Sequence, residues 1–165
     1  WHRFGDAGFK HYQVMECGFK YNMMDLQAAI GIHQLAKVET HWQRRQEIWQ
    51  RYQSDLSTLA LQLPAKVESN TRHAYHLYTA LIDEKHSGIC RDEFLDKMTE
   101  RNIGVGVHYL SIPEHPYYQQ RFGWRPEDYP NAMAIGRSTV SLPLSAKLSN
   151  ADMDRIVDAI HEVLP

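Results

Sequence analysis

The sequence predicts an α+β fold in which two helices precede strands that alternate with further helices. Two stretches with apolar residues at helical spacing occupy the first part of the chain, and short β-type runs follow them. The chain has 165 residues, 43% of them hydrophobic, which is enough to supply the core of one ordinary domain. In order, we expect two helices and then strand, helix, strand, loop, strand and helix.

The first part of the chain is predicted to be helical after an irregular start. Residues 1–16 mix aromatic residues, glycine and charge without a period, so we expect an irregular or extended lead-in. Helical spacing begins at Asp25. A second, longer amphipathic stretch runs over residues 38–59, and Pro64 ends the helical section.

The remaining elements are shorter and have clearer boundaries. Residues 75–82 are aromatic and apolar without a breaker, which is typical of a buried strand, and residues 91–101 show helical spacing. A glycine-interrupted β-type run covers residues 103–109, and a second short strand is predicted over residues 138–144. Ser149 with Asp152 forms a capping-box pattern ahead of an apolar stripe, so we expect the chain to end in an amphipathic helix.

A segment rich in Pro, Tyr and His, residues 109–132, separates the last two predicted strands. We expect a long loop, and loops of this length in compact domains are often binding loops. Imidazoles and phenols there can hydrogen-bond sugar hydroxyls or phosphates while their rings offer stacking surface. The alternative, which composition alone does not disfavour, is that the aromatic rings only anchor the loop to the core. The residues in question are His108, Tyr109, His115, Tyr117 and Tyr118.

Lys20 and Asn22 lie just ahead of the first predicted helix, within GFKYNMMDLQAAIG. First-turn N–H groups lack intrahelical partners and the helix dipole favours negative charge, so an amide and an ammonium at this place suit a phosphate or carboxylate. A simpler interpretation, which residue type alone favours, is that Asn22 or Asp25 caps the helix and Lys20 is solvated.

Composition argues against several other classes of function. The net charge is −2 and basic residues do not gather in one run, so we expect no nucleic-acid partner and no attraction to an anionic membrane. No apolar run approaches the roughly 20 residues that span a bilayer. Two distant cysteines favour a reducing, cytoplasmic location. The ten histidines show no HExxH or comparable spacing, so no metal site is predicted.

Several motifs together resemble one family. GFKYNMMDLQAAIGIHQLAKVE is similar to a segment of the DegT/DnrJ/EryC1/StrS nucleotide-sugar aminotransferases. Further motifs follow in the family's order and bring the resemblance to nearly the whole chain. They are RRQEIWQRY from Arg44, HAYHLYTALID from His73, RDEFLDKMTERNIGVGVHY from Arg91, HPYYQQRFG from His115 and VSLPL from Val140.

The resemblance implies the C-terminal portion of a fold-type-I transferase that depends on pyridoxal 5′-phosphate (PLP). Such enzymes move an amino group from glutamate onto a keto sugar nucleotide, here most similar to the branch acting on UDP-4-keto sugars for lipopolysaccharide or surface polysaccharide. The implied organisation is a lead-in from a missing large domain over residues 1–24, linking helices over 25–62, and the C-terminal small α+β domain over 63–165. The chain begins at Trp1 rather than at a methionine, which also favours a piece of a longer protein.

The resemblance also implies where the site lies. Family members are homodimers with shared active sites, and the position of Asn22 reaches the partner's cofactor phosphate. Many members have asparagine at the position of Lys20 and arginine at that of Asn22, so Lys20 and Asn22 are both candidates for cofactor binding. Which of the two contacts the phosphate stays open, with Asn22 favoured.

His108, Tyr109, His115 and Tyr117 match the part of the family pattern near the nucleotide-sugar cleft, so they are predicted to bind substrate. No lysine of this chain has the setting of the Schiff-base lysine, so no catalytic residue is assigned and the chain alone is expected to be inactive. The alternative functions are a non-catalytic sugar-nucleotide-binding or protein-interaction module, or a dehydratase-like relative.

Overall fold

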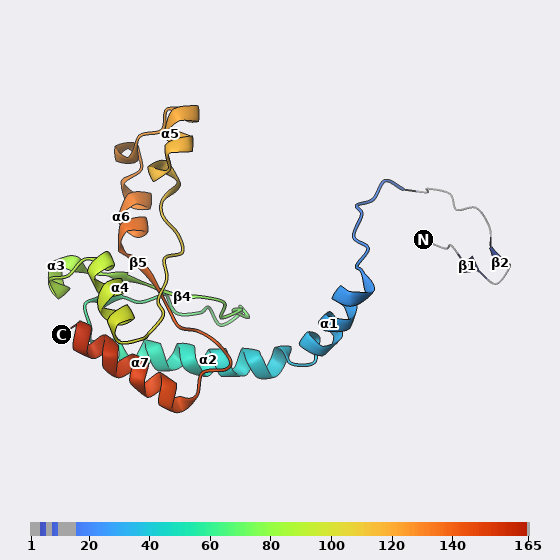
Figure 1. Cartoon of the computed structure of the whole chain (residues 1–165), viewed down its shortest axis with the longest axis horizontal. Coiled ribbons are helices and arrows are strands. Elements are labelled where there is room, and N and C mark those ends of the chain that lie inside the picture. Colours follow the sequence, from blue (N-terminus) through green and yellow to red (C-terminus); the bar gives the residue numbers. More distant parts are fainter. Residues whose placement is uncertain (1–3, 6–7, 10–15, 165) are drawn as a thin grey trace. The chain divides into compact units, whose positions relative to one another are not determined.

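A computed structural model describes residues 4–5, 8–9 and 16–164 of the chain (Figure 1). The chain forms two compact units, Trp1–Lys37 and Val38–Pro165. Among the described residues, no helix is both long and apolar enough to cross a membrane.

In the first unit, strands β1 (Phe4–Gly5) and β2 (Gly8–Phe9) pair antiparallel. An extended segment leads from Cys17 to helix α1 (Asp25–Leu35), which begins where the sequence predicts it. The helix has no buried residue. Its apolar side chains are exposed; they include Leu26, Ile30, Ile32 and Leu35.

The second unit is built on a three-stranded antiparallel sheet of order β3-β4-β5. The strands are β3 (Leu61–Gln62), β4 (Tyr78–Ile82) and β5 (Thr139–Leu142). Three helices, α2 (Val38–Asp55), α4 (Arg91–Glu100) and α7 (Asn150–Val163), supply most of the rest of its core. In the view of Figure 1, α2 and α7 lie below strands β4 and β5.

The core lies on one face of this sheet. Alternate residues of β4 are fully buried, and the register places Val140 opposite Ala80 and Leu142 opposite Tyr78, so these side chains point to the same face. Helix α2 adds Trp49, whose ring packs edge-on against Tyr78 with centroids 4.7 Å apart. Burial of large apolar side chains is the main stabilising contribution in such a core.

Helix α7 is the clearest case of a sequence signal that the structure confirms. The Ser149 hydroxyl accepts a hydrogen bond from the Asp152 N–H at 3.1 Å, and the Asp152 carboxylate accepts one from the Ser149 N–H at 2.9 Å. This is the predicted capping box, and it satisfies two backbone donors at the start of the helix. Helix α4 and strand β5 also lie within their predicted ranges.

Two predicted strands differ from the structure. The run 103–109 is not a strand, because it meets the sheet only through an isolated bridge between Gly106 and Ser141. The strand predicted from Tyr75 begins at Tyr78, since Tyr75 has a left-handed backbone conformation with φ of 47°.

The end of the helical section was also predicted too late. Helix α2 ends at Asp55, and β3 pairs with β4 where the sequence predicted more helix. A two-residue strand is too short to show a period. The assignment of residues 25–62 as linking helices in a whole enzyme stays a prediction, although α2 is part of the compact second unit.

The predicted long loop is largely helical instead. It contains η1 (Ile112–Glu114), α5 (Pro116–Phe122) and η2 (Pro126–Asp128), and its end enters α6 (Pro130–Ser138). A proline stands in the first turn of each of these elements, where its fixed φ suits a helix start and its missing N–H costs nothing. The prolines that indicated a loop therefore mark helix N-termini. A further short helix, α3 (Glu84–Ser87), was not predicted.

Candidate functional site

His108 lies over the sheet face that is opposite the core. Because Val140 and Leu142 point into the core, the Ser141 side chain between them points to the other face. The Nδ1 atom of His108 lies 2.8 Å from the Ser141 Oγ. The outer face of β5 therefore holds the imidazole that the sequence predicts for substrate binding.

The Tyr109 ring packs against the His108 ring and is itself exposed to solvent. The two rings meet edge to face with centroids 4.8 Å apart, and Tyr109 is 74% exposed. His108 itself is half-buried. Gly106 is close beneath, since a Cβ added there would lie 3.2 Å from the His108 Cε1. The glycine-interrupted run thus gives the backbone room to carry the histidine ring.

His115 and Tyr117 form a second group at the start of α5. Both are exposed, and each ring lies edge-on to Tyr118, with centroid distances of 6.4 and 5.4 Å. Tyr118 in turn stacks on Trp124 with centroids 5.7 Å apart. Tyr118 therefore packs against other rings of the same segment, and among the described residues no ring contact joins it to the core, whereas Tyr117 is exposed. Within the described residues, no hydrogen bond or ring contact joins this group to His108 and Tyr109.

The segment between these two groups is fixed by contacts that the sequence did not indicate. The Ser111 hydroxyl donates to the Ala132 carbonyl of α6. The buried Arg91 donates from Nη1 to the Gly136 carbonyl at 3.2 Å. Arg137 pairs with Glu114 at 3.0 Å. The Ser111 and Glu114 contacts tie the chain after His108 to α6, and the Arg91 contact ties α4 to α6. No local motif in the sequence indicates these contacts.

Lys20 and Asn22 lie in the extended segment ahead of α1 and are exposed. The N-cap of α1 is Met24, whose N–H donates to the Gln27 side chain at 3.1 Å, so neither Asn22 nor Asp25 caps the helix. Neither Lys20 nor Asn22 makes a hydrogen bond or ion pair with any described residue. An ammonium and an amide fit the phosphate of PLP by their chemistry.

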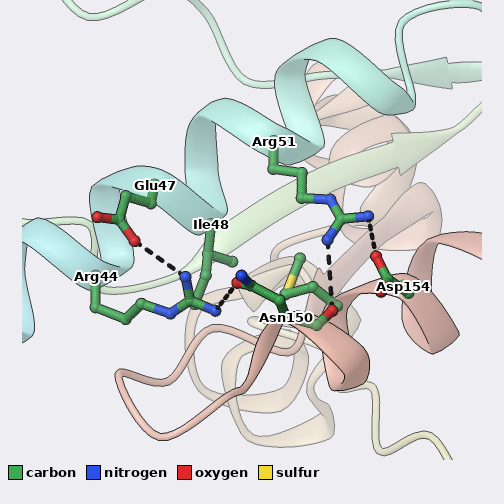
Figure 2. Close-up of a pocket in the computed structure, with 7 residues that line it drawn as sticks. Arg44, Glu47, Ile48, Arg51, Asn150 and Asp154 are labelled. Carbon is green, nitrogen blue, oxygen red and sulfur yellow. Dashed lines mark hydrogen bonds and ion pairs between the residues drawn. The ribbon is translucent and has the colours of Figure 1, made fainter.

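A hollow of about 440 Å³ lies between α2 and α7, lined by charged side chains (Figure 2). Arg51 donates to Asp154 at 2.6 Å and to Asp55 at 3.0 Å. Arg44 donates to Asn150 at 2.9 Å and to the Leu148 carbonyl at 2.8 Å. Because both guanidinium groups are already bound, we interpret this hollow as a polar clamp between two helices rather than a ligand site.

In the described part of the chain, no group of three or more His, Cys, Asp or Glu side chains gathers in a way that could hold a metal ion.

Solved structures of sugar aminotransferases share this fold. The PMP form of Spr1654 from Streptococcus pneumoniae, named as a sugar aminotransferase, superposes with a TM-score of 0.78 at 27% identity over 93% of this chain and 38% of that chain. Helicobacter pylori PseC, an aminotransferase involved in the biosynthesis of pseudoaminic acid, superposes with a TM-score of 0.75 at 23% identity. The match covers 98% of this chain and 44% of that chain. At 23% identity that second likeness shows the fold alone. The fold is therefore that of part of an aminotransferase.

Sequence comparison places the chain within one family of this class. The model of the DegT/DnrJ/EryC1/StrS aminotransferase family matches residues 2–161, so the chain belongs to that family. Spore coat polysaccharide biosynthesis protein SpsC of Bacillus subtilis is 39% identical over an alignment of 165 positions, which covers 99% of this chain and 42% of that protein. Protein MJ1066 of Methanocaldococcus jannaschii is 36% identical over 164 residues, with the same coverage. The chain thus spans 42% of the length of these curated relatives.

Proposed function

We propose that this chain is the C-terminal portion of a PLP-dependent aminotransferase that moves an amino group from glutamate to a keto sugar nucleotide. The family match over residues 2–161 carries the proposal. The name of SpsC supports a role in surface polysaccharide biosynthesis, and the PLP and PMP forms of Spr1654 support the cofactor. The motifs GFKYNM and GVGVHY favour a UDP-4-keto sugar as acceptor, for lipopolysaccharide or a related polymer.

In this proposal, the chain supplies half of a cofactor site. PLP, when bound, supplies the carbonyl and the electron sink for amino transfer. The Lys20 ammonium and the Asn22 amide hold its phosphate, because both are exposed donors without a partner among the described residues. The Schiff-base lysine belongs to the large domain, and the cofactor served is that of the second subunit of a homodimer in the cytoplasm.

The chain also supplies the sugar-nucleotide side of the site. His108 is half-buried with one ring nitrogen occupied by Ser141, so the other nitrogen can hydrogen-bond an oxygen of the substrate. The exposed rings of Tyr109 and Tyr117 offer apolar faces for a sugar or a base. His115 adds a second exposed imidazole beside Tyr117.

Substitution of His108 by Ala in the full-length enzyme tests this substrate-side role. Loss of one hydrogen bond to the substrate should raise the KM for a UDP-4-keto pentose about tenfold, while the KM for glutamate stays within about twofold. His86→Ala is the control, because His86 is an exposed histidine of α3 whose ring contacts Asp83, the N-cap of that helix, and it belongs to neither group of predicted substrate-binding residues. Equal rises in both KM values would exclude His108 from a role on the sugar side.

A half-reaction tests the class of function itself. Full-length protein loaded with PLP and mixed with glutamate should release 2-oxoglutarate in proportion to enzyme, without any sugar present. If no 2-oxoglutarate forms and the protein still binds UDP, the non-catalytic binding module becomes the better description.

A further inference from the structure

Ser141 carries a buried hydroxyl on the sheet face that bears His108. The residue is 5% exposed, and its neighbours in β5 point into the core. Among the described residues, the Ser141 Oγ has one hydrogen-bond partner, the His108 Nδ1 at 2.8 Å. The backbones of Ser141 and Gly106 also exchange two hydrogen bonds, at 2.8 and 3.1 Å. The hydroxyl and the segment carrying the imidazole are therefore held by the same bridge.

The burial of the hydroxyl determines the direction of this hydrogen bond. If His108 Nδ1–H donated to the Ser141 oxygen, the serine proton would be a buried donor with no acceptor among the described residues. If the serine hydroxyl donates to Nδ1, its proton is satisfied and the imidazole is the neutral tautomer with hydrogen on Nε2. Buried polar groups are almost always paired, so the second arrangement is favoured.

We propose that Ser141 is a positioning residue that holds His108 in the Nε2–H tautomer and presents this N–H as a donor to an oxygen of the substrate. The inference rests on the proposed substrate-side role of His108. A neutral donor of this kind suits the oxygens of a nucleoside diphosphate, which are acceptors only. It also explains a serine in the middle of a buried strand whose other face is apolar.

Gly106 supports the same arrangement from below. A Cβ at this position would approach the His108 Cε1 to 3.2 Å and Nδ1 to 3.6 Å, so the ring lies directly against the backbone there. The imidazole is thus bounded by Gly106 below, Ser141 at Nδ1 and the Tyr109 ring at its edge. Its Nε2 remains as the nitrogen without a partner among the described residues.

Histidine ring ¹⁵N shifts of the full-length enzyme test the contact directly. In the unsubstituted protein, we expect His108 to show a proton on Nε2 and a hydrogen-bonded acceptor at Nδ1. Ser141→Ala should move the Nδ1 signal to that of an acceptor without a hydrogen bond. A proton on Nδ1, or a spectrum unchanged by Ser141→Ala, would overturn the proposal.

A double-mutant cycle separates positioning from a merely structural role. We expect Ser141→Ala to weaken the Kd for UDP about tenfold, and to have no further effect in a His108→Ala background. Ser138→Ala is the matched control, because among the described residues the Ser138 hydroxyl donates only to carbonyls of its own helix, Ala134 at 2.7 Å and Ile135 at 3.5 Å. Equal effects of Ser141→Ala in both backgrounds would show that it acts through the fold and would overturn the proposal.

The same measurements distinguish this inference from the proposed function. If His108→Ala leaves the Kd for UDP unchanged, or the unsubstituted enzyme does not bind UDP, the assigned uridine-nucleotide role of His108 is wrong. The ¹⁵N spectrum then still decides whether Ser141 sets the tautomer.

Discussion

At the scale of single residues, Gly136 shows how closely the segment after His108 packs on α6. A Cβ built on Gly136 would lie 2.8 Å from the Ser111 backbone nitrogen, and closer still to the Ser111 hydroxyl. Real Cβ atoms do not approach backbone so closely, so the segment or the helix would have to move. The glycine in the last turn of α6 therefore permits this close approach, although glycine is a poor helix former.

Gly136→Ala should destabilise the protein and disturb the site. Overpacking against backbone costs about 1–3 kcal/mol, which exceeds the gain of about 1 kcal/mol from replacing a helical glycine. We expect a lower midpoint of thermal unfolding and a higher KM for the sugar nucleotide, because Ser111 is two residues after Tyr109. The control is Gly104→Ala, where an added Cβ meets nothing within 4 Å. A midpoint for Gly136→Ala at or above that of the unsubstituted protein would contradict this account.

At the scale of elements, the sequence predicts the helices and strands whose periodicity or capping pattern lies within their own residues. Helices α2 and α7 have apolar stripes, and α7 also has its own capping box, so periodicity identified both helices, although it placed the end of α2 too late. Strand β3 has two residues and depends on pairing with β4, which no local pattern shows. The run 103–109 has β-type composition, but in the described residues it shares only an isolated bridge with the sheet, between Gly106 and Ser141.

The candidate site was predicted in part for the same reason. Residue type identified His108 and the exposed tyrosines as candidates, and these remain candidates in the structure. Ser141, Ser111 and Arg91 were missed, because each acts on a residue more than 20 positions away. Contacts of this kind follow from tertiary packing and leave no spacing in the sequence to find.

The start of α7 yields a prediction with a defined pH dependence. Hydrogen bonds from the Ser149 side chain and backbone hold the pKa of Asp152 below its usual 3.8. Because the pKa of this carboxyl is lower in the folded state than in the unfolded state, its ionised form stabilises the fold at any pH above the unfolded-state pKa. This stabilisation is lost as the pH falls through the folded-state pKa. Asp152→Asn should therefore lower the midpoint of urea unfolding at pH 7, and the difference from the unsubstituted protein should shrink below about pH 4.

Asp158→Asn is the control for this experiment. Asp158 is an exposed carboxylate later in the same helix, without a hydrogen bond or ion pair among the described residues. Its substitution should leave the urea midpoint nearly unchanged at both pH values. A constant difference for Asp152→Asn between pH 7 and pH 3 would exclude a contribution from its ionised form.

At the scale of the whole molecule, the proposed sites are incomplete by themselves. The second unit offers donors and rings for a sugar nucleotide, and the first unit offers two donors for a phosphate. The chain spans 42% of the length of its curated relatives, and in the proposed function the remainder of the full-length enzyme supplies the rest of each site. The proposed homodimer adds a further condition, since Lys20 and Asn22 would then serve the cofactor of the other subunit.

Mixed dimers test this exchange between subunits. One full-length subunit carries Lys20→Ala with Asn22→Ala, which removes charge-assisted hydrogen bonds worth about 1–3 kcal/mol each, and the other lacks the Schiff-base lysine. Each homodimer should be inactive at limiting PLP. If the sites are shared between subunits, a dimer of one subunit of each kind has both defects in one active site and none in the other. Random mixing makes about half of the dimers of this mixed kind, so we expect about a quarter of the activity of the unsubstituted enzyme. If each subunit served its own cofactor, both sites of every hybrid would be defective, and the mixture would stay inactive.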